Sequence, residues 1–231
     1  VRAPAWKLFR RPQLSNPMFA NRSEAGRALA RQLRHLADRP DLLVLGLPRG
    51  GIPVAYEVAQ ALGAELDLLV VRKLGVPRQP ELAMGAIASG GAVVVNDEVL
   101  RMAQVTPSQF HLVRAAEQTE LEQRERLYRG SRPPFQAEQR CVIVVDDGLA
   151  TGASMRAALY ALRLLDPEWL VAAVPVAPPD ADERMRQAAD EFVSVLSPHD
   201  FNSVGSYYRD FHQTTDDEVR ELLQRARRTA A

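Results

Sequence analysis

The sequence predicts an α/β fold with a doubly wound, mainly parallel sheet flanked by helices. Short continuous apolar runs recur along the chain, and segments with helical spacing of apolar residues separate them. A continuous apolar run fits a strand that is covered on both faces, as in a parallel sheet. Strands that alternate with helices favour right-handed crossovers within one sheet. The length of 231 residues suits one large domain, 1–231.

The expected elements follow one another in a regular order. After an irregular N-terminal arm at 1–20, a helix should begin at Asn21 or Ser23 and end before Pro40, since a residue preceding proline is pushed out of the helical region. Strands are then expected at 42–45, 66–71, 141–145, 170–176 and 192–196, and helices at 53–62, from the Ser154 turn to about 165, at 180–190 and at 216–227. Two short strands, 83–88 and 92–95, should flank a Gly-Gly turn.

Three segments are interpreted as additions to this sheet. Residues 97–129 predict a helical insertion in two stretches, the second opened by Thr106 as its cap and by a proline at the first helical position. Residues 197–231 predict an aromatic loop and a C-terminal helix, which together with the N-terminal arm would form a small hood. Residues 74–81 are polar and interrupted by Gly and Pro, so they predict a mobile loop.

Composition and charge exclude several classes of function. The 29 basic and 29 acidic side chains give a formal net charge of zero, so no long-range field steers the protein toward nucleic acid or an anionic membrane. No apolar run approaches the roughly 20 residues of a membrane span, and residues 1–12 lack the apolar stretch of a signal peptide. The single cysteine, Cys141, cannot form an internal disulfide, which suits a reducing cytoplasm. We therefore expect a cytoplasmic protein that binds neither nucleic acid nor membrane.

The richest chemistry follows the strand expected at 141–145. Asp146 and Asp147 come directly after it, and a turn of small and hydroxyl residues at 150–154 leads into a helix. The N-terminus of a helix presents unpaired N–H groups and a partial positive charge, which favour a phosphate. Carboxylates only accept hydrogen bonds, so they suit sugar hydroxyls or a divalent cation. The segment therefore predicts a sugar-phosphate site.

Simpler interpretations of this segment compete with that prediction. A Gly-rich turn between strand and helix is often only a turn, and an Asp pair at a strand end can hold a metal alone. The segment is not a P-loop, because the GxxxxGK[ST] spacing and its lysine are missing. The order of apolar strand, two acids and Thr-Gly-x-Ser is more restrictive than any of its parts.

Residues 142–154, VIVVDDGLATGAS, resemble the phosphoribosyl-pyrophosphate (PRPP) signature of type I phosphoribosyltransferases. The resemblance implies that Asp146 and Asp147 meet the ribose hydroxyls and hold Mg²⁺, through water or substrate, while residues 150–154 wrap the 5′-phosphate. Gly148 departs from the family, which usually has an aliphatic residue there, but this removes no ligand-contacting group. With LPRGG and VRKLGVP earlier in the chain, the sequence resembles a bacterial group of phosphoribosyltransferases with no named acceptor, and the fold-level analogy extends over 20–215.

The LPRGG segment follows the first expected strand. Gly50 and Gly51 let backbone N–H groups point at an anion, and Arg49 adds a fork of donors for phosphate oxygens. The alternative is a plain turn with a surface arginine. In the family that the sequence resembles, this segment is the pyrophosphate loop.

Arg72 and Lys73 end the second expected strand and should reach the same rim. Adjacent basic residues are usually solvated and without a function, but this placement suits neutralisation of a leaving pyrophosphate. The following loop, 74–81, corresponds to a flexible lid in the family. Arg78 and Glu81 are candidates for contacts on closure.

The predicted site can be stated residue by residue. The predicted PRPP-binding residues are Arg49, Gly50, Gly51, Arg72, Lys73, Asp146, Asp147, Gly148, Ala150, Thr151, Gly152, Ala153 and Ser154. Those expected to be catalytic are Arg49, Lys73, Asp146 and Asp147. In the aromatic loop, Phe201 and Tyr207 are predicted to stack on a base. The alternative, favoured for Phe211, is that these rings pin the tail to the core.

The resemblance implies Mg²⁺-dependent transfer of a 5-phosphoribosyl group between PRPP and a nitrogenous base, with pyrophosphate as product. A nucleoside monophosphate would be the substrate in reverse. Ala150 stands where enzymes that use hypoxanthine or guanine carry an aspartate, which disfavours 6-oxopurines and leaves adenine, pyrimidine and other acceptors open. The alternative is a PRPP- or nucleotide-sensing protein without turnover; Lys73 and the expected lid favour an enzyme. The sequence leaves the oligomeric state open, and a homodimer is among the alternatives.

Overall fold

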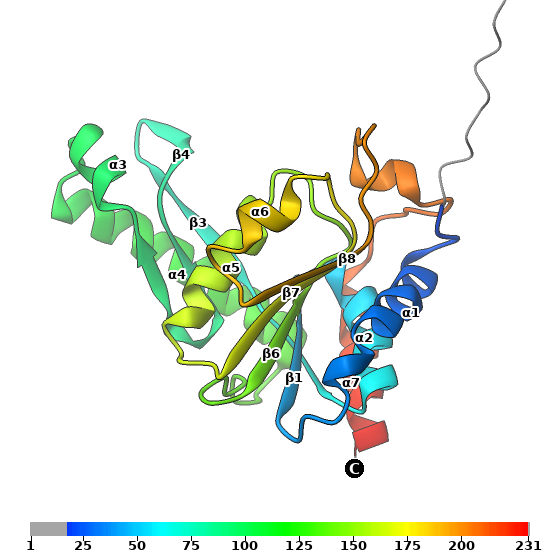
Figure 1. Ribbon diagram of the computed structural model, residues 1–231. Helices are drawn as coiled ribbons and strands as arrows, with labels where there is room; N and C mark the ends of the chain where they lie inside the picture. Colours follow the sequence, from blue (N-terminus) through cyan, green and yellow to red (C-terminus); the bar gives the residue numbers. More distant parts are fainter. Residues whose placement is uncertain (1–17, 231) are drawn as a thin grey trace, which may run out of the picture.

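A computed structural model describes residues 18–230, so nearly all of the arm expected at 1–20 lies outside the described residues. Its centre is a five-stranded sheet in the order β2-β1-β6-β7-β8 (Figure 1). The strands are β1 (Leu42–Gly46), β2 (Glu65–Leu68), β6 (Cys141–Val145), β7 (Trp169–Val176) and β8 (Glu191–Leu196). Each neighbouring pair is parallel, which confirms the predicted sheet.

Helices cover both faces of this sheet, as a doubly wound fold requires. One face packs against α1 (Arg22–Gln32), α2 (Gly51–Leu62) and α7 (Asp216–Ala230), and the other against α5 (Ala153–Arg163) and α6 (Ala181–Met185). Every residue of β1 and of β6 is buried, because each of these central strands is covered on both sides. The helix expected at 180–190 is shorter than predicted and ends at Met185.

Helix starts follow the local signals in the sequence. The Asn21 side chain accepts the Glu24 N–H at 3.0 Å, so Asn21 rather than Ser23 caps α1. Thr106 and Gln109 form a capping box at the start of α4 (Pro107–Arg129), which follows the short helix α3 (Asp97–Met102). Short 3-10 helices lie at Arg34–Leu36, Ser89–Gly91 and Val204–Tyr207. No helix in the described part of the chain is long and apolar enough to span a bilayer.

The prediction of a mobile loop at 74–81 is wrong, because this segment forms an antiparallel hairpin. β3 (Val71–Val76) pairs with β4 (Gln79–Ala88), and β5 (Val93–Val95) completes a three-stranded sheet. Leu74 and Val76 are buried in it. Gly75 marks an irregular register: a Cβ there would lie 2.5 Å from the Pro80 carbonyl oxygen. The glycine therefore permits close approach of two strands rather than a loop.

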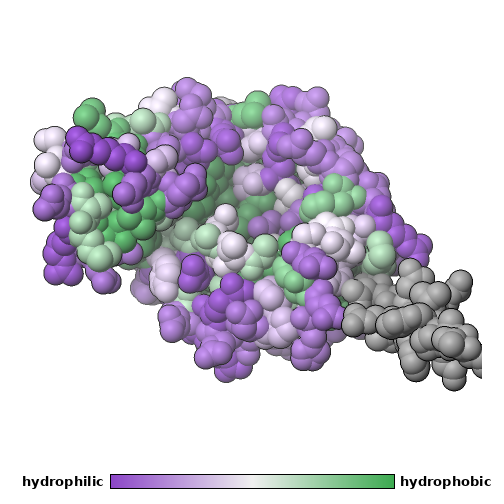
Figure 2. Space-filling model, turned by 90° about the horizontal axis from the view of Figure 1, so that it is seen from above, coloured by the Kyte–Doolittle hydropathy of each residue, from purple (hydrophilic) through white to green (hydrophobic). Residues whose placement is uncertain are grey.

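The strand expected at 66–71 is also wrong in its extent. β2 ends at Leu68, and Arg72 and Lys73 belong to β3 of the hairpin. Figure 1 shows β3, β4, α3 and α4 on one side of the molecule and the orange segment around residue 200 on the other. Seen from above, the surface of the protein is hollowed near its centre, and hydrophobic residues lie in the hollow (Figure 2).

Candidate functional site

The LPRGG loop and the acid motif lie against one another. β1 and β6 are neighbours with Gly46 opposite Val145, so the loops that follow them leave from the same sheet edge. The Leu47 N–H donates to the Val145 carbonyl at 2.9 Å. A Cβ at Gly50 would collide with the Asp147 carboxylate, and one at Gly51 would lie 2.6 Å from the Val145 carbonyl oxygen. Both glycines thus permit the contact between the two motifs. The peptide bond between Pro48 and Arg49, in the same loop, is cis.

The turn after the acid pair lines a small pocket. Its volume is about 200 Å³, and its lining comprises Asp146, Gly148, Leu149, Ala150, Thr151, Gly152, Ala153, Ser154, Met155 and Val204. Gly152 has φ +72°, a left-handed conformation that favours glycine, and α5 begins at the next residue. The α6 residue Arg184 donates to the carbonyls of Thr151 and Ala150 at 3.1 and 3.3 Å, so it braces the turn from outside. Sequence reasoning did not single out Arg184.

The two carboxylates have different surroundings. An Asp146 oxygen accepts the Asp147 N–H at 2.9 Å, whereas Asp147 Oδ2 accepts from Arg22 Nε at 2.8 Å. Burial raises the pKa of Asp146 well above its usual value, and the neighbouring Asp147 charge raises it further. Burial also raises the pKa of Asp147, but the Arg22 guanidinium opposes that shift. Arg22 is therefore the cation of the acid pair.

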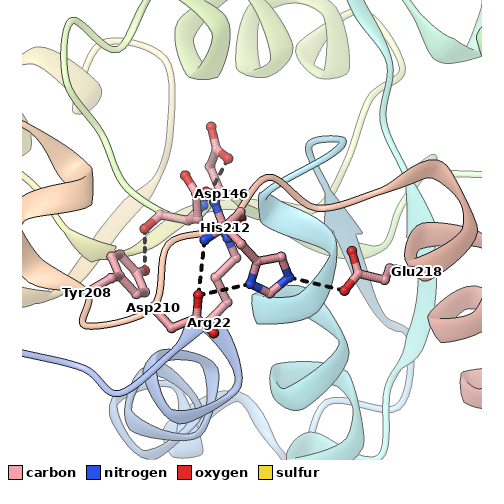
Figure 3. A network of polar contacts seen from close by, with 7 residues as sticks. Arg22, Asp146, Tyr208, Asp210, His212 and Glu218 are labelled. Carbon is pink, nitrogen blue, oxygen red and sulfur yellow. Dashed lines mark hydrogen bonds and ion pairs between the residues drawn. The ribbon is translucent and has the colours of Figure 1, made fainter.

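Arg22 is a residue beside the acid pair that the sequence analysis did not predict. It is the first residue of α1 and only 8% exposed. Its Nη1 donates to the His212 carbonyl at 2.7 Å, and its guanidinium lies 4.0 Å from the centre of the Phe211 ring. Figure 3 shows Arg22, His212 and Tyr208 near Asp146. One feature of the sequence could have indicated Arg22: it is a cation at the N-terminus of a helix, where the helix dipole disfavours a positive charge unless an acidic partner is near.

The aromatic loop supports the acid motif from the other side. The Tyr208 hydroxyl donates to the Asp147 carbonyl at 2.5 Å, and burial together with the Asp147 charge raises the Tyr208 pKa. Tyr207 is 1% exposed and stacks on Phe201, with ring centres 5.8 Å apart. The prediction that Tyr207 stacks on a base does not fit a ring enclosed in this way. Phe201 is half-buried, and its contact with a base stays a prediction.

The three basic side chains expected at the rim contact other groups. Arg49 lies 3.7 Å from Asp216 at the start of α7. Arg72 donates from Nε to Glu117 of α4 at 2.7 Å, and Lys73 pairs with Glu81 of the hairpin at 3.1 Å. None of the three forms an ion pair with Asp146 or Asp147 in residues 18–230. Their contacts with PRPP stay predictions.

The acid pair fits a cation that arrives with its ligand. Among the described residues, no three His, Cys, Asp or Glu side chains cluster in a way that would hold a metal. Mg²⁺ is commonly held by one or two carboxylates together with substrate phosphates and water. Asp146 and Asp147 are half-buried carboxylates next to the turn at 150–154, and they match that donor set.

The parallel sheet, with the LPRGG loop and the acid motif at one edge, can now be compared with known proteins. The family model described as "Phosphoribosyl transferase domain" matches residues 19–211, so the chain belongs to this family. The crystal structure of TT1426 from Thermus thermophilus is 44% identical, with a TM-score of 0.81, over 90% of this chain and 98% of that chain.

Two curated proteins are also similar to this chain. They come from two strains of Mycobacterium tuberculosis and carry the name "Putative phosphoribosyl transferase". Each is 45% identical over 214 residues, which cover 93% of this chain and 48% of the relative. The chain therefore spans about half the length of the curated relatives it matches.

Proposed function

We propose that this chain transfers a 5-phosphoribosyl group between PRPP and a nitrogenous base in a Mg²⁺-dependent reaction that yields pyrophosphate. The observation that carries the proposal is the packing of the LPRGG loop on the Asp146–Asp147 pair at the adjoining ends of β1 and β6. The loop that would hold the diphosphate and the motif that would hold the sugar phosphate are then close enough to bind the same PRPP molecule.

Each part of the edge has a defined task in this reaction. The turn at 150–154 binds the 5′-phosphate through amides at the start of α5, and Asp146 and Asp147 accept hydrogen bonds from the ribose hydroxyls. The amides of Gly50 and Gly51, with Arg49, hold the diphosphate. Arg49 pairs with Asp216 across 3.7 Å at a half-exposed position, a weak contact that a diphosphate can displace.

Little covalent work is required of the protein. Breaking the bond between ribose C1 and pyrophosphate leaves positive character on the sugar and negative charge on the leaving group, so catalysis rests on positioning and charge stabilisation. Mg²⁺, when bound, supplies neutralisation of the pyrophosphate charge. We assign Lys73 the same task from the hairpin. Its partner Glu81 is 98% exposed, and such a surface pair is easily broken.

The acceptor is proposed to be a base other than a 6-oxopurine. Ala150 lines the pocket and is exposed, and a methyl group cannot serve as the acid or base that hypoxanthine or guanine would require there. Phe201 is half-buried and precedes the pocket residue Val204 by three positions in the sequence. We retain its ring as the proposed contact with the base. Adenine, pyrimidines and other nitrogenous bases are the candidate acceptors.

The sugar site is tested by calorimetry with PRPP and Mg²⁺. The wild-type protein is expected to bind, and Asp146→Asn and Asp147→Asn are expected to abolish binding, because each loses a charged hydrogen-bond acceptor. Asp182→Asn, which removes an exposed carboxylate on α6, is the matched control and should bind as the wild type does. Unchanged affinity in the Asp146 and Asp147 variants would refute the assignment.

A PRPP sensor without turnover is the second candidate function. It is favoured by one observation, the engagement of Arg72 with Glu117 and of Lys73 with Glu81 outside the acid pair. Pyrophosphate release measured across a panel of bases separates the two. Release with at least one base supports the transferase, whereas tight PRPP binding without release for any base supports the sensor.

A further inference from the structure

The Asp147 carboxylate is fixed at one oxygen and open at the other. Oδ2 accepts from Arg22 Nε at 2.8 Å and lies against Gly50 so closely that a Cβ there would collide with it. The Asp147 carbonyl accepts the Tyr208 hydroxyl at 2.5 Å. Within residues 18–230, no other residue donates a hydrogen bond to Oδ1. The carboxylate is therefore held in one orientation, and its Oδ1 accepts no hydrogen bond from another described residue.

Arg22 is itself held in place by contacts on several sides. It is 8% exposed, and its Nη1 donates to the His212 carbonyl at 2.7 Å. The guanidinium lies over the Phe211 ring at 4.0 Å, an arrangement that favours a desolvated cation. Because the guanidinium is planar and rigid, these contacts also define the direction in which Nε points at Asp147.

Helix formation alone does not explain an arginine at this position. Arg22 begins α1, where the helix dipole disfavours a positive charge, and the acid that suits this end is Glu24. Asp147, 125 residues later in the chain, provides the compensating charge. The interaction therefore serves the acid pair at the sheet edge rather than the helix.

The segment that receives Arg22 is anchored on α7. The His212 ring contacts Asp210 through Nδ1 at 3.0 Å and Glu218 of α7 through Nε2 at 3.2 Å (Figure 3). The loop at 208–212 is thus docked on the acid pair by Tyr208 and Arg22, and on α7 by His212. The geometry of Asp147 depends on α1, the 208–212 loop and α7 together.

We propose that Arg22 is a positioning residue for PRPP binding. Its ion pair holds the Asp147 carboxylate in the orientation that leaves Oδ1 for a ribose hydroxyl, and it offsets one of two adjacent negative charges that a polyanionic substrate approaches. The inference rests on the proposed function, since it assigns Asp147 to the ribose. Arg22 touches neither the reacting atoms nor the phosphates; it acts through Asp147.

The test compares Arg22→Gln, Arg22→Lys and Arg27→Gln by calorimetry with PRPP and Mg²⁺. We expect Arg22→Gln to weaken PRPP binding by about 10- to 100-fold, the usual effect of removing a residue that orients a ligand-binding side chain. Arg22→Lys should recover part of this loss, because it restores the charge but not the planar fork. Arg27→Gln removes an exposed pair with Glu57 on the same helix and should leave the affinity within about twofold.

A double-mutant cycle separates positioning from general stability. If Arg22 acts through Asp147, the affinity losses caused by Arg22→Gln and by Asp147→Glu should combine to less than their product, because the longer Glu side chain already shifts the carboxylate that Arg22 orients. Losses that multiply would overturn the proposal. Should Arg22→Gln fail to fold, Phe211→Leu removes the ring beneath the guanidinium, a ring that also lies 5.0 Å from the Tyr208 ring, and should weaken PRPP binding in the same direction; unchanged affinity there would also overturn the proposal.

Failure of this inference is distinguishable from failure of the proposed function. If the wild type does not bind PRPP, the proposed function fails. If the wild type binds and Asp147→Asn does not, while Arg22→Gln binds as the wild type does, only the role of Arg22 is refuted.

Discussion

Two regions of this molecule carry residues expected to bind the same ligand, and the fold treats them differently. The loops after β1 and β6 are in contact, because neighbouring parallel strands end at one edge. Arg72 and Lys73, by contrast, lie on β3 of an antiparallel hairpin and pair with Glu117 and Glu81. Adjacency within a parallel sheet follows from strand order, whereas the direction of a hairpin side chain depends on what packs beside it.

The comparison shows where motif-based inference is strong. The LPRGG loop and the acid motif are about a hundred residues apart in sequence, yet two glycines without room for a Cβ bring them together. Next to the basic pair, Gly75 also lacks room for a Cβ, but there it allows β3 and β4 to approach one another and brings neither Arg72 nor Lys73 to the acid motif. The first region is already assembled for the proposed site, and the basic side chains of the second would have to move to take part in it.

Gly51→Ala should give the largest effect on the preformed region. A Cβ at this position lies 2.6 Å from the Val145 carbonyl oxygen, so the LPRGG loop must shift away from β6. We expect PRPP binding to be lost and the free energy of unfolding to fall by about 1–3 kcal/mol, as for overpacked cores. Calorimetry and urea unfolding measure the two quantities.

Gly63→Ala is the control for that prediction. Gly63 has φ +65° with open space around it, so alanine costs roughly 1–2 kcal/mol of stability through backbone strain but touches no loop of the site. PRPP affinity should be retained. Equal affinity in the two variants would mean that the contact between the loops is not needed for binding.

Lys73→Ala tests whether the hairpin takes part in turnover. If Lys73 offsets charge on the leaving pyrophosphate, kcat should fall by about 100-fold, by analogy with the loss of one oxyanion donor. The stability should change by less than about 1 kcal/mol, since the pair with Glu81 is exposed. Arg72→Ala, which breaks the contact with α4, should affect turnover less. Equal kcat values for wild type and Lys73→Ala would confine catalysis to the preformed edge.

Gly148→Ala sharpens the comparison within the edge itself. A Cβ there would collide with Val204 of the C-terminal 3-10 helix, so this glycine permits the hood to approach the acid motif. We expect a loss of about 1–3 kcal/mol in the free energy of unfolding. The double variant with Val204→Ala should recover much of it. Absence of recovery would show that the collision is not the cause.

The His212 contacts give the smallest effect, and it depends on pH. Hydrogen bonds to Asp210 and Glu218 raise the pKa of His212 above its usual value. Their stabilisation is therefore complete below about pH 6.5, the unfolded value, and is lost as pH rises through the higher folded pKa. Urea unfolding of wild type and His212→Gln should differ more at acidic than at alkaline pH. A difference independent of pH would contradict the assignment.

Particular elements show how far sequence reasoning reached. The parallel strands and the capping residue Thr106 follow local patterns and were predicted, and Asn21 was one of the two caps expected for α1. The hairpin was missed because Gly75 was interpreted as a loop residue, although it marks a close approach to Pro80 between two strands. Tyr207 was expected at a ligand, but the packing of Phe201 against its ring places it in the core.

The sequence by itself determined the alternation of parallel strands and helices and the acid-and-turn motif, because apolar spacing, caps and turn residues act over a few neighbouring positions. Only the tertiary structure decided which charged groups meet. Arg22 reaches Asp147 across 125 residues since α1, the 208–212 loop and the end of β6 pack together, and no local pattern encodes that meeting. Packing of α4 beside β3 likewise brings Arg72 to Glu117, and the pairing of β3 with β4 brings Lys73 to Glu81.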